Sequence, residues 1–114
     1  MKRNKLTLDL YGQYTYNKKV DKPAKVQITK FAEKQLRKIP QAIQQHVRYW
    51  AESVELIGLR EVRKLSGYHD EPLKGKRLGQ RSIRLNRAYR LIYEEDTNGE
   101  LIIISVVEVS KHEY

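Results

Sequence analysis

The chain has 114 residues, of which 39% are hydrophobic and 32% are charged, and this is the composition of one globular domain with one core. It contains no cysteine, which excludes disulfides, thiolate metal ligands and cysteine nucleophiles. Its net charge of +9 predicts a polyanionic partner, such as nucleic acid, an acidic membrane or an acidic protein. No apolar run is long enough for a transmembrane helix, and the N-terminus lacks the apolar stretch of a signal peptide. We therefore expect a cytoplasmic protein without membrane contacts.

The first 24 residues differ from the rest of the chain because they are rich in lysine, arginine and tyrosine. In "KLTLDLYGQYTY" the residues Leu6, Leu8 and Leu10 alternate, which predicts a strand, and Gly12 indicates a turn or a bulge. The tyrosines of this segment could stack on nucleic-acid bases, but a role in a surface strand is the simpler explanation for them. We expect a basic, Tyr-rich extension over residues 1–24 and a main domain over residues 25–114.

The main domain begins with a predicted strand and two predicted helices. "AKVQIT" is typical of a short strand, and Thr29 is a candidate N-cap for a helix that reaches about Lys38. Pro40 ends this helix and suits the first turn of the next one. The second helix ends near Gly58, and "LREVRKL" after it predicts one more helical turn. Its apolar stripe consists of Ile43, Val47, Trp50, Val54 and Ile57.

The rest of the chain predicts a loop and three strands. "SGYHDEPLKGKRLGQ" is a loop by its Gly, Pro and Ser content, and strands follow at about Arg81–Asn86, Tyr89–Glu95 and Leu101–Ser110. Asn98-Gly99 predicts a hairpin between the last two strands. The last strand is apolar nearly throughout, which predicts a central strand buried on both faces. The fold class is α+β, with an N-terminal helical hairpin packed on a small antiparallel sheet.

Arginine recurs at every third residue from Arg81 to Arg90 within "GQRSIRLNRAYRLIYEE". A three-residue turn over residues 86–88 separates the apolar from the polar side chains, so burial selects this register. It pairs Leu85 with Tyr89, Ile83 with Leu91, and Arg81 with Tyr93. It also places Arg84 opposite Arg90, where the two guanidinium groups repel each other unless an anion lies between them. The planar fork of arginine suits a phosphate.

The C-terminal "EVSKHEY" adds groups that can transfer protons. In an extended chain Glu108, Ser110, His112 and Tyr114 share one face, with Lys111 adjacent. Beside two arginines, a histidine and a tyrosine form a proton-transfer set for a phosphodiester. RNA carries its own nucleophile, the 2′-OH, so the site needs neither cysteine nor metal, and we expect no cofactor. A frayed polar tail is the alternative interpretation.

The segment "EPLKGKRLGQRSIRLNRAYRLIYEE" resembles the RelE/ParE toxin superfamily of type II toxin–antitoxin systems, in particular its HigB-like branch. The shared pattern is Gly79, Ser82, Ile83, Arg84, Leu85, Asn86, Tyr89 and Arg90. The resemblance covers about residues 25–114 and implies a bacterial endoribonuclease that cuts messenger RNA, usually in the ribosomal A site. The implied reaction is attack of the 2′-OH on the adjacent phosphate, which leaves a 2′,3′-cyclic phosphate and a 5′-OH.

The resemblance also implies roles for particular residues. Arg90 corresponds to the phosphate-binding arginine, Arg84 to the basic residue of the preceding strand, and His112 and Tyr114 to catalytic residues near the C-terminus. Arg81 is a further catalytic candidate, although relatives often have an aromatic residue or histidine there, and the ending "HEY" differs from their common acid-Tyr-His. We favour His112 as base, with an arginine or Tyr114 as phosphate stabiliser or acid. The expected RNA-binding residues are Lys74, Lys76, Arg77, Arg87 and Lys111.

The same resemblance implies partners and alternatives. We expect a cognate antitoxin that wraps the basic cleft, in a complex that binds operator DNA chiefly through the antitoxin. The alternatives are a ParE-like toxin that inhibits DNA gyrase without cleaving RNA, and a non-catalytic RNA- or ribosome-binding module. His69 is a weaker site candidate, because relatives carry functional residues in this loop, but a loop histidine beside Asp70 is expected to be solvated. His46 is expected to be structural, and Trp50 to belong to the core.

Overall fold

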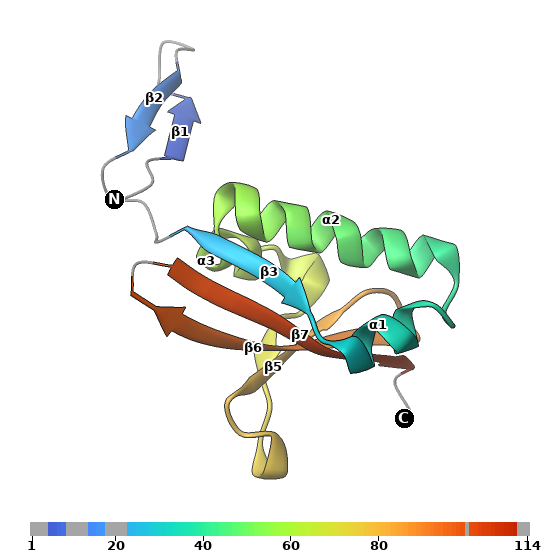
Figure 1. The fold of residues 1–114 in the computed structure, drawn as a ribbon. Coiled ribbons are helices and arrows are strands. Elements are labelled where there is room, and N and C mark those ends of the chain that lie inside the picture. Colours follow the sequence, from blue (N-terminus) through green and yellow to red (C-terminus); the bar gives the residue numbers. More distant parts are fainter. Residues whose placement is uncertain (1–4, 9–13, 18–22, 100, 112–114) are drawn as a thin grey trace.

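The structure is a computed structural model, which describes residues 5–8, 14–17, 23–99 and 101–111. Its main body is a five-stranded sheet in the order β3-β7-β6-β5-β4, crossed on one face by a long helix, α2 (Figure 1). The helices are α1 (Lys30–Leu36), α2 (Gln41–Ile57) and α3 (Leu59–Arg63), with 3-10 turns η1 (Ser66–Tyr68) and η2 (Gly75–Arg77). The strands of this sheet are β3 (Ala24–Ile28), β4 (Glu71–Pro72), β5 (Gln80–Arg84), β6 (Tyr89–Asn98) and β7 (Leu101–Lys111).

The α+β class is confirmed, but the sheet is mixed and the prediction of a purely antiparallel sheet is wrong. β3 runs parallel to β7, with Ala24 opposite Ile102 and Ile28 opposite Val106, while the other neighbouring strands are antiparallel. Parallel strands need a long crossover between them. Here the helices and the later strands all lie between β3 and β7 in the chain, so the first strand of the body pairs with the last.

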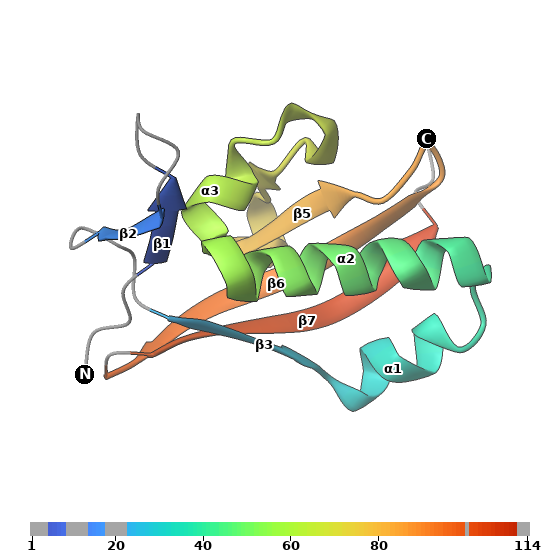
Figure 2. The same cartoon turned by 90° about the horizontal axis from the view of Figure 1, so that it is seen from above.

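The two first helices form as the sequence indicates, with Thr29 capping α1 through a 3.1 Å hydrogen bond from the Ala32 amide. α1 ends at Leu36, slightly before the predicted end, and Pro40 is the N-cap of α2. α1 lies beside β7, and its Gln35 side chain accepts a 2.7 Å hydrogen bond from the Val109 amide. α2 instead packs on β3 and α3 (Figure 2). The predicted helical hairpin is therefore not established as a packed unit.

The core lies between α2 and the sheet. Four residues of the predicted α2 stripe, Ile43, Val47, Trp50 and Val54, are buried, whereas the fifth, Ile57, is 38% exposed at the end of the helix. Trp50 is fully buried and its ring lies 5.1 Å from that of Tyr93 on β6, so its prediction as a core residue is confirmed. Gly58 ends α2 at a φ of 92°, a backbone conformation that favours glycine, and the chain turns there into α3.

β7 lies inside the sheet, but only one of its faces is fully buried. Ile104, Val106 and Val109 face the core, whereas Ile103 and Val107 on the other face are partly exposed. The expectation of burial on both faces is thus only half right, because the helices cover a single face of the sheet. β7 also has one residue more than β6 between the pairs Ile92–Glu108 and Tyr93–Val106, which is a β-bulge.

The loop that precedes β5 is more ordered than the sequence suggests. It contains η1, η2 and the two-residue strand β4, which pairs with Ser82 and Arg81 of β5. Near the N-terminus, β1 (Lys5–Leu8) and β2 (Tyr14–Asn17) pair into a separate two-stranded sheet. The division into a 1–24 extension and a 25–114 domain stays a prediction. No helix of the described residues is long and apolar enough to cross a membrane.

Candidate functional site

The β5–β6 hairpin has the register that burial predicts. The observed pairs are Arg81–Tyr93, Ile83–Leu91 and Arg84–Arg90, with a 2.9 Å hydrogen bond from the Leu85 amide to the Tyr89 carbonyl. Asn86 closes the turn, because its side chain accepts hydrogen bonds of 2.8 Å from the Ala88 and Tyr89 amides. Ile83 and Leu91 are buried in the core. Side chains alternate along a strand, so Arg84 and Arg90 lie together on the face that α2 does not cover.

A pocket of about 70 Å³ opens beside this pair, and we call it the arginine pocket. Its polar lining consists of His69, Glu71, Ser82, Arg84, Asn86, Arg87 and Arg90, with Tyr89 at the side. Three cationic side chains therefore converge on a space that also holds a carboxylate and an imidazole. Such a combination can bind an anion and can also exchange protons with it.

Arg90 carries the most informative atom of the pocket. Its Nε is buried and has no hydrogen-bond partner among the described residues. A buried donor without a partner costs about 1–3 kcal/mol, and more when it is charged. The opposing Arg84 guanidinium adds repulsion. An anion in the pocket would relieve both penalties, so the unpartnered Nε supports an anion site.

The end of β7 pairs with the part of β6 that lines the pocket. Ser110 lies opposite Arg90, and the Ser110 hydroxyl donates a 2.8 Å hydrogen bond to Glu108, which confirms that these two residues share the face of the arginine pair. Arg77 forms an ion pair with Glu108. Burial raises the pKa of the Glu108 carboxyl, but hydrogen bonds from Ser110 and Arg77 and the charges of Arg77 and Arg90 outweigh burial. The net pKa is below its ordinary value.

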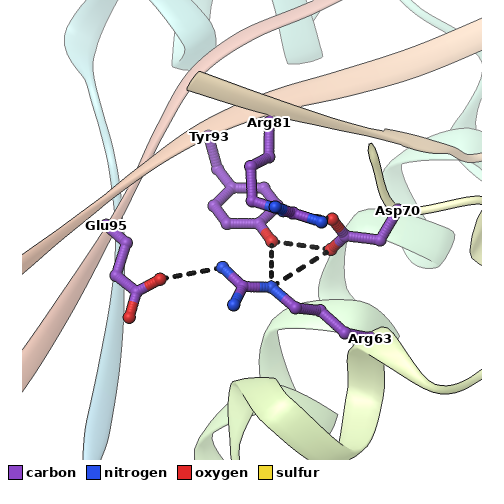
Figure 3. Close-up of polar contacts among 5 residues, drawn as sticks. All are labelled: Arg63, Asp70, Arg81, Tyr93 and Glu95. Carbon is purple, nitrogen blue, oxygen red and sulfur yellow. Dashed lines mark hydrogen bonds and ion pairs between the residues drawn. The ribbon is translucent and has the colours of Figure 1, made fainter. Parts of the chain in front are cut away.

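Asp70 joins the loop before β5 to the core face of the sheet (Figure 3). Its carboxylate is 1% exposed and accepts hydrogen bonds of 2.6 Å from Arg81 Nε and from the Tyr93 hydroxyl. Arg63 of α3 donates to the Tyr93 hydroxyl at 3.2 Å and to Glu95 at 2.8 Å. We call these five residues the Asp70 cluster. Burial and the bond to Asp70 raise the pKa of Tyr93 far above its usual value.

The Asp70 cluster positions one wall of the arginine pocket. The chain neighbours of Asp70 are His69 and Glu71, and both line the pocket. His69 has a φ of 46°, which non-glycine residues rarely adopt. Such a conformation persists only where the surroundings hold it. The anchoring of Asp70 supplies that hold.

The structure brings together some predicted residues and separates others. Arg84, Arg87 and Arg90 line the pocket, whereas Arg81 lies on the opposite face, bound to Asp70. Arg77 is paired with Glu108, and Lys74, Lys76 and Lys111 are exposed. His112 and Tyr114 lie outside the described residues.

One pocket residue, Glu71, had no assigned role in the sequence-based prediction, yet it lines the pocket. His69 was a weaker candidate that was expected to be solvated, and it is indeed exposed while it lines the pocket. Glu71 reaches it because β4 pairs Glu71 with Ser82, and nothing in a two-residue strand within a polar loop marks that pairing. No cluster of three or more His, Asp or Glu side chains suited to a metal ion occurs in the described part of the chain.

No protein-family model and no curated protein matches the chain in sequence, but solved structures match its fold. The YoeB/ParE toxin from Agrobacterium tumefaciens has a TM-score of 0.56 at 17% identity, covering 78% of this chain and 99% of that chain. The RelBE2 toxin–antitoxin complex from Mycobacterium tuberculosis gives 0.56 at 26% identity, with coverages of 79% and 99%. The DinJ–YafQ toxin–antitoxin complex of E. coli gives 0.55 at 17% identity, with coverages of 78% and 92%.

Proposed function

Starting from the fold of this chain, which is that of the RelE/ParE superfamily of toxins, we propose that the protein is the toxin of a type II toxin–antitoxin system. We further propose that it is a metal-independent endoribonuclease that cuts messenger RNA in the ribosomal A site. The observation that carries this proposal is the arginine pair, in which the buried Arg90 Nε has no hydrogen-bond partner in the part of the chain that the structure describes. A non-enzymatic toxin has no evident need for two opposed guanidinium groups beside a carboxylate and an imidazole.

In the proposed reaction, Arg84 and Arg90 hold the phosphate that lies 3′ of the attacking nucleotide. The 2′-OH attacks that phosphorus while a base removes its proton, and the bond to the 5′ oxygen of the next nucleotide breaks. The leaving oxygen takes up a proton, so the products are a 2′,3′-cyclic phosphate and a 5′-OH. The guanidinium groups stabilise the extra negative charge of the pentavalent transition state.

We keep His112 as the proposed base and Tyr114 as the proposed acid or phosphate stabiliser. β7 ends at Lys111, opposite the pocket residue Tyr89, and His112 is the next residue of the chain. Glu71 is a second candidate base, because its carboxylate lines the pocket itself. For Arg81 we propose that it acts through Asp70, and for Lys74, Lys76, Arg77, Arg87 and Lys111 that they contact the RNA backbone.

The proposed partner is a cognate antitoxin. RelBE2 and DinJ–YafQ, two of the structures with this fold, are complexes of a toxin with its antitoxin. A surface with a net charge of +9 favours an acidic segment as the neutralising partner. Operator DNA would be bound chiefly by the antitoxin of such a complex.

The test is cleavage of a messenger RNA by the purified protein, with and without translating ribosomes, with the cut positions and end groups determined. We expect codon-phased cuts with cyclic-phosphate ends that depend on ribosomes. Arg90→Ala should lower the rate about 100- to 1000-fold, and it should still bind RNA, although more weakly than the wild type. Arg48→Ala, an exposed arginine on α2 outside the pocket, is the matched control. Intact RNA under both conditions would refute the nuclease and favour gyrase as the target.

His112→Ala and Glu71→Gln separate the two candidate bases. The variant that removes the true base should lose the limb of the pH–rate profile that reports its ionisation, whereas the other variant should keep that limb. If both variants cleave with the wild-type rate and profile, neither residue is the base.

A further inference from the structure

A second pocket, of about 340 Å³, adjoins the arginine pocket at Arg84, which lines both. Its other walls come from α2, from η1 with the residue before it, and from the residue that follows β5. The lining includes His46, Tyr49, Leu65, Tyr68 and Leu85. We call it the aromatic pocket. Its volume is at the lower end of the range of small-molecule sites.

The aromatic pocket is lined in part by large apolar side chains that are exposed to solvent. Tyr49 is 52% exposed and Leu65 is 47% exposed, and both belong to the few large apolar residues on the described surface. Gln45 donates a 2.8 Å hydrogen bond to the Tyr49 hydroxyl, so the Tyr49 ring is held in place. Tyr68 is partly buried, and burial raises the pKa of its hydroxyl. The pocket thus offers fixed, uncharged ring faces next to a guanidinium.

His46 adds a polar atom whose character is determined by its neighbour. His46 Nδ1 lies 2.8 Å from the Leu85 carbonyl oxygen, and a carbonyl oxygen can only accept a hydrogen bond. Nδ1 therefore carries a proton, and in the neutral ring Nε2 is a hydrogen-bond acceptor. An acceptor beside aromatic rings matches the amino and imino N–H groups of nucleic-acid bases.

We propose that the aromatic pocket binds the base of the nucleotide adjoining the phosphate held by Arg84 and Arg90. This inference rests on the proposed function and adds to it a subsite for a single-stranded base. Continuity favours a nucleotide over an apolar peptide side chain, because a nucleotide joins a flat base to a phosphate one sugar away. The two adjacent pockets offer the matching pair of surfaces, ring faces beside a cationic cradle.

The test compares short RNAs that cannot be cleaved. A labelled oligoribonucleotide blocked by 2′-O-methyl groups is measured by fluorescence anisotropy beside abasic versions that each lack one base. In the wild-type protein, one abasic position should weaken binding about 5- to 150-fold. In Tyr49→Ala/Leu65→Ala, the intact RNA and that abasic RNA should bind with nearly equal affinity. Both substituted side chains are exposed, so the variant should fold.

Two further variants serve as controls for the preference for intact over abasic RNA. Tyr49→Phe keeps the ring and should retain the preference for the intact RNA. Phe31→Ala removes an aromatic residue that is 60% exposed on α1, away from the pocket, and should behave as wild type. The proposal is refuted if base removal weakens binding by the same factor in the wild type and in Tyr49→Ala/Leu65→Ala.

The arginine variants separate this result from failure of the proposed function. If Arg84→Ala and Arg90→Ala bind every RNA as the wild type does, the phosphate site itself is wrong, and the base subsite fails with it. If these variants lose affinity while the aromatic pocket has no effect on base removal, only the subsite is wrong.

Discussion

Replacing Asp70 by alanine removes a buried carboxylate that contacts three elements of the fold. In the wild type, Asp70 accepts hydrogen bonds from Arg81 on β5 and from Tyr93 on β6, and Arg63 of α3 lies 4.0 Å away. In the variant, the Arg81 guanidinium loses the carboxylate that it binds, while Arg63 keeps its ion pair with Glu95. The Tyr93 hydroxyl, on a fully buried residue, loses the oxygen to which it donates.

The magnitude follows from burial. Breaking a buried charge pair by removing one partner costs about 3–5 kcal/mol. The Arg63 and Arg81 side chains are 30% and 27% exposed, so water recovers part of that loss. We therefore expect Asp70→Ala to lower the free energy of unfolding by about 3 kcal/mol. In a domain of this size each kcal/mol corresponds to roughly 4–8 °C of melting temperature.

The assay is urea denaturation followed by circular dichroism, with thermal melting as a second measurement. Asp70→Asn should cost less, about 1–2 kcal/mol, because the amide oxygen still accepts from Arg81 and the amide group can donate to Tyr93. Asp96→Ala, an exposed carboxylate in the β6–β7 hairpin, is the control and should stay within about 0.5 kcal/mol of wild type. If Asp70→Ala is also within that range, the Asp70 cluster does not anchor the loop.

Three other expectations concern the sheet. Folding lowers the pKa of Glu108, so its ion pair with Arg77 should stabilise the protein at pH values above the unfolded pKa of a glutamate, about 4.3. The free energy of unfolding should therefore exceed that of Glu108→Gln there, and the difference should vanish as the pH falls through the folded pKa. Equal pH profiles of the unfolding free energy for the two proteins would contradict this. Folding raises the pKa of Tyr93, so the free energy of unfolding should fall as the pH rises above about 10. At such a pH, Tyr93→Phe should leave the tyrosinate absorbance of the folded protein unchanged and should reduce that of the unfolded protein. A lower absorbance of the folded variant would contradict this. Arg84→Ala should leave the free energy of unfolding equal or raise it by about 0.2–1 kcal/mol, since it removes repulsion from Arg90, and denaturant titration showing a loss above 1 kcal/mol would contradict this.

Features of the fold that depend on neighbouring residues are predictable from the sequence. The register of the β5–β6 hairpin follows from burial, because only one turn length puts Ile83 and Leu91 on the same face, and the pairing of Arg84 with Arg90 follows from it. The N-cap at Thr29 and the C-cap at Gly58 depend only on residues within a few positions of each cap. Such features need no knowledge of the rest of the chain.

Contacts between segments that are far apart in the chain are not predictable in this way. Nothing in Ala24–Ile28 indicates that its partner is β7, some 78 residues further along, as Gln27 and Ser105 illustrate. The Asp70 cluster is equally non-local, because Asp70 bonds to residues 11 and 23 positions away. A buried aspartate in a Gly- and Pro-containing loop has the same local pattern as a solvated one. The position of Glu71 in the pocket depends on that anchoring and could not be predicted before it.

The β-bulge in β7 gives the two ends of one strand opposite parity. Up to Val106 the even-numbered residues point to the core, and after the extra residue the core position is the odd-numbered Val109. Had strict alternation continued, Glu108 would have pointed toward α2 and its charge would have been buried. The bulge thus lets the same strand bury Val106 and Val109 while Glu108 and Ser110 lie on the face of Arg84 and Arg90. Deleting one residue at the bulge would exchange the two faces of the strand after Val106, so that Glu108 would lie on the core face and Val109 on the other.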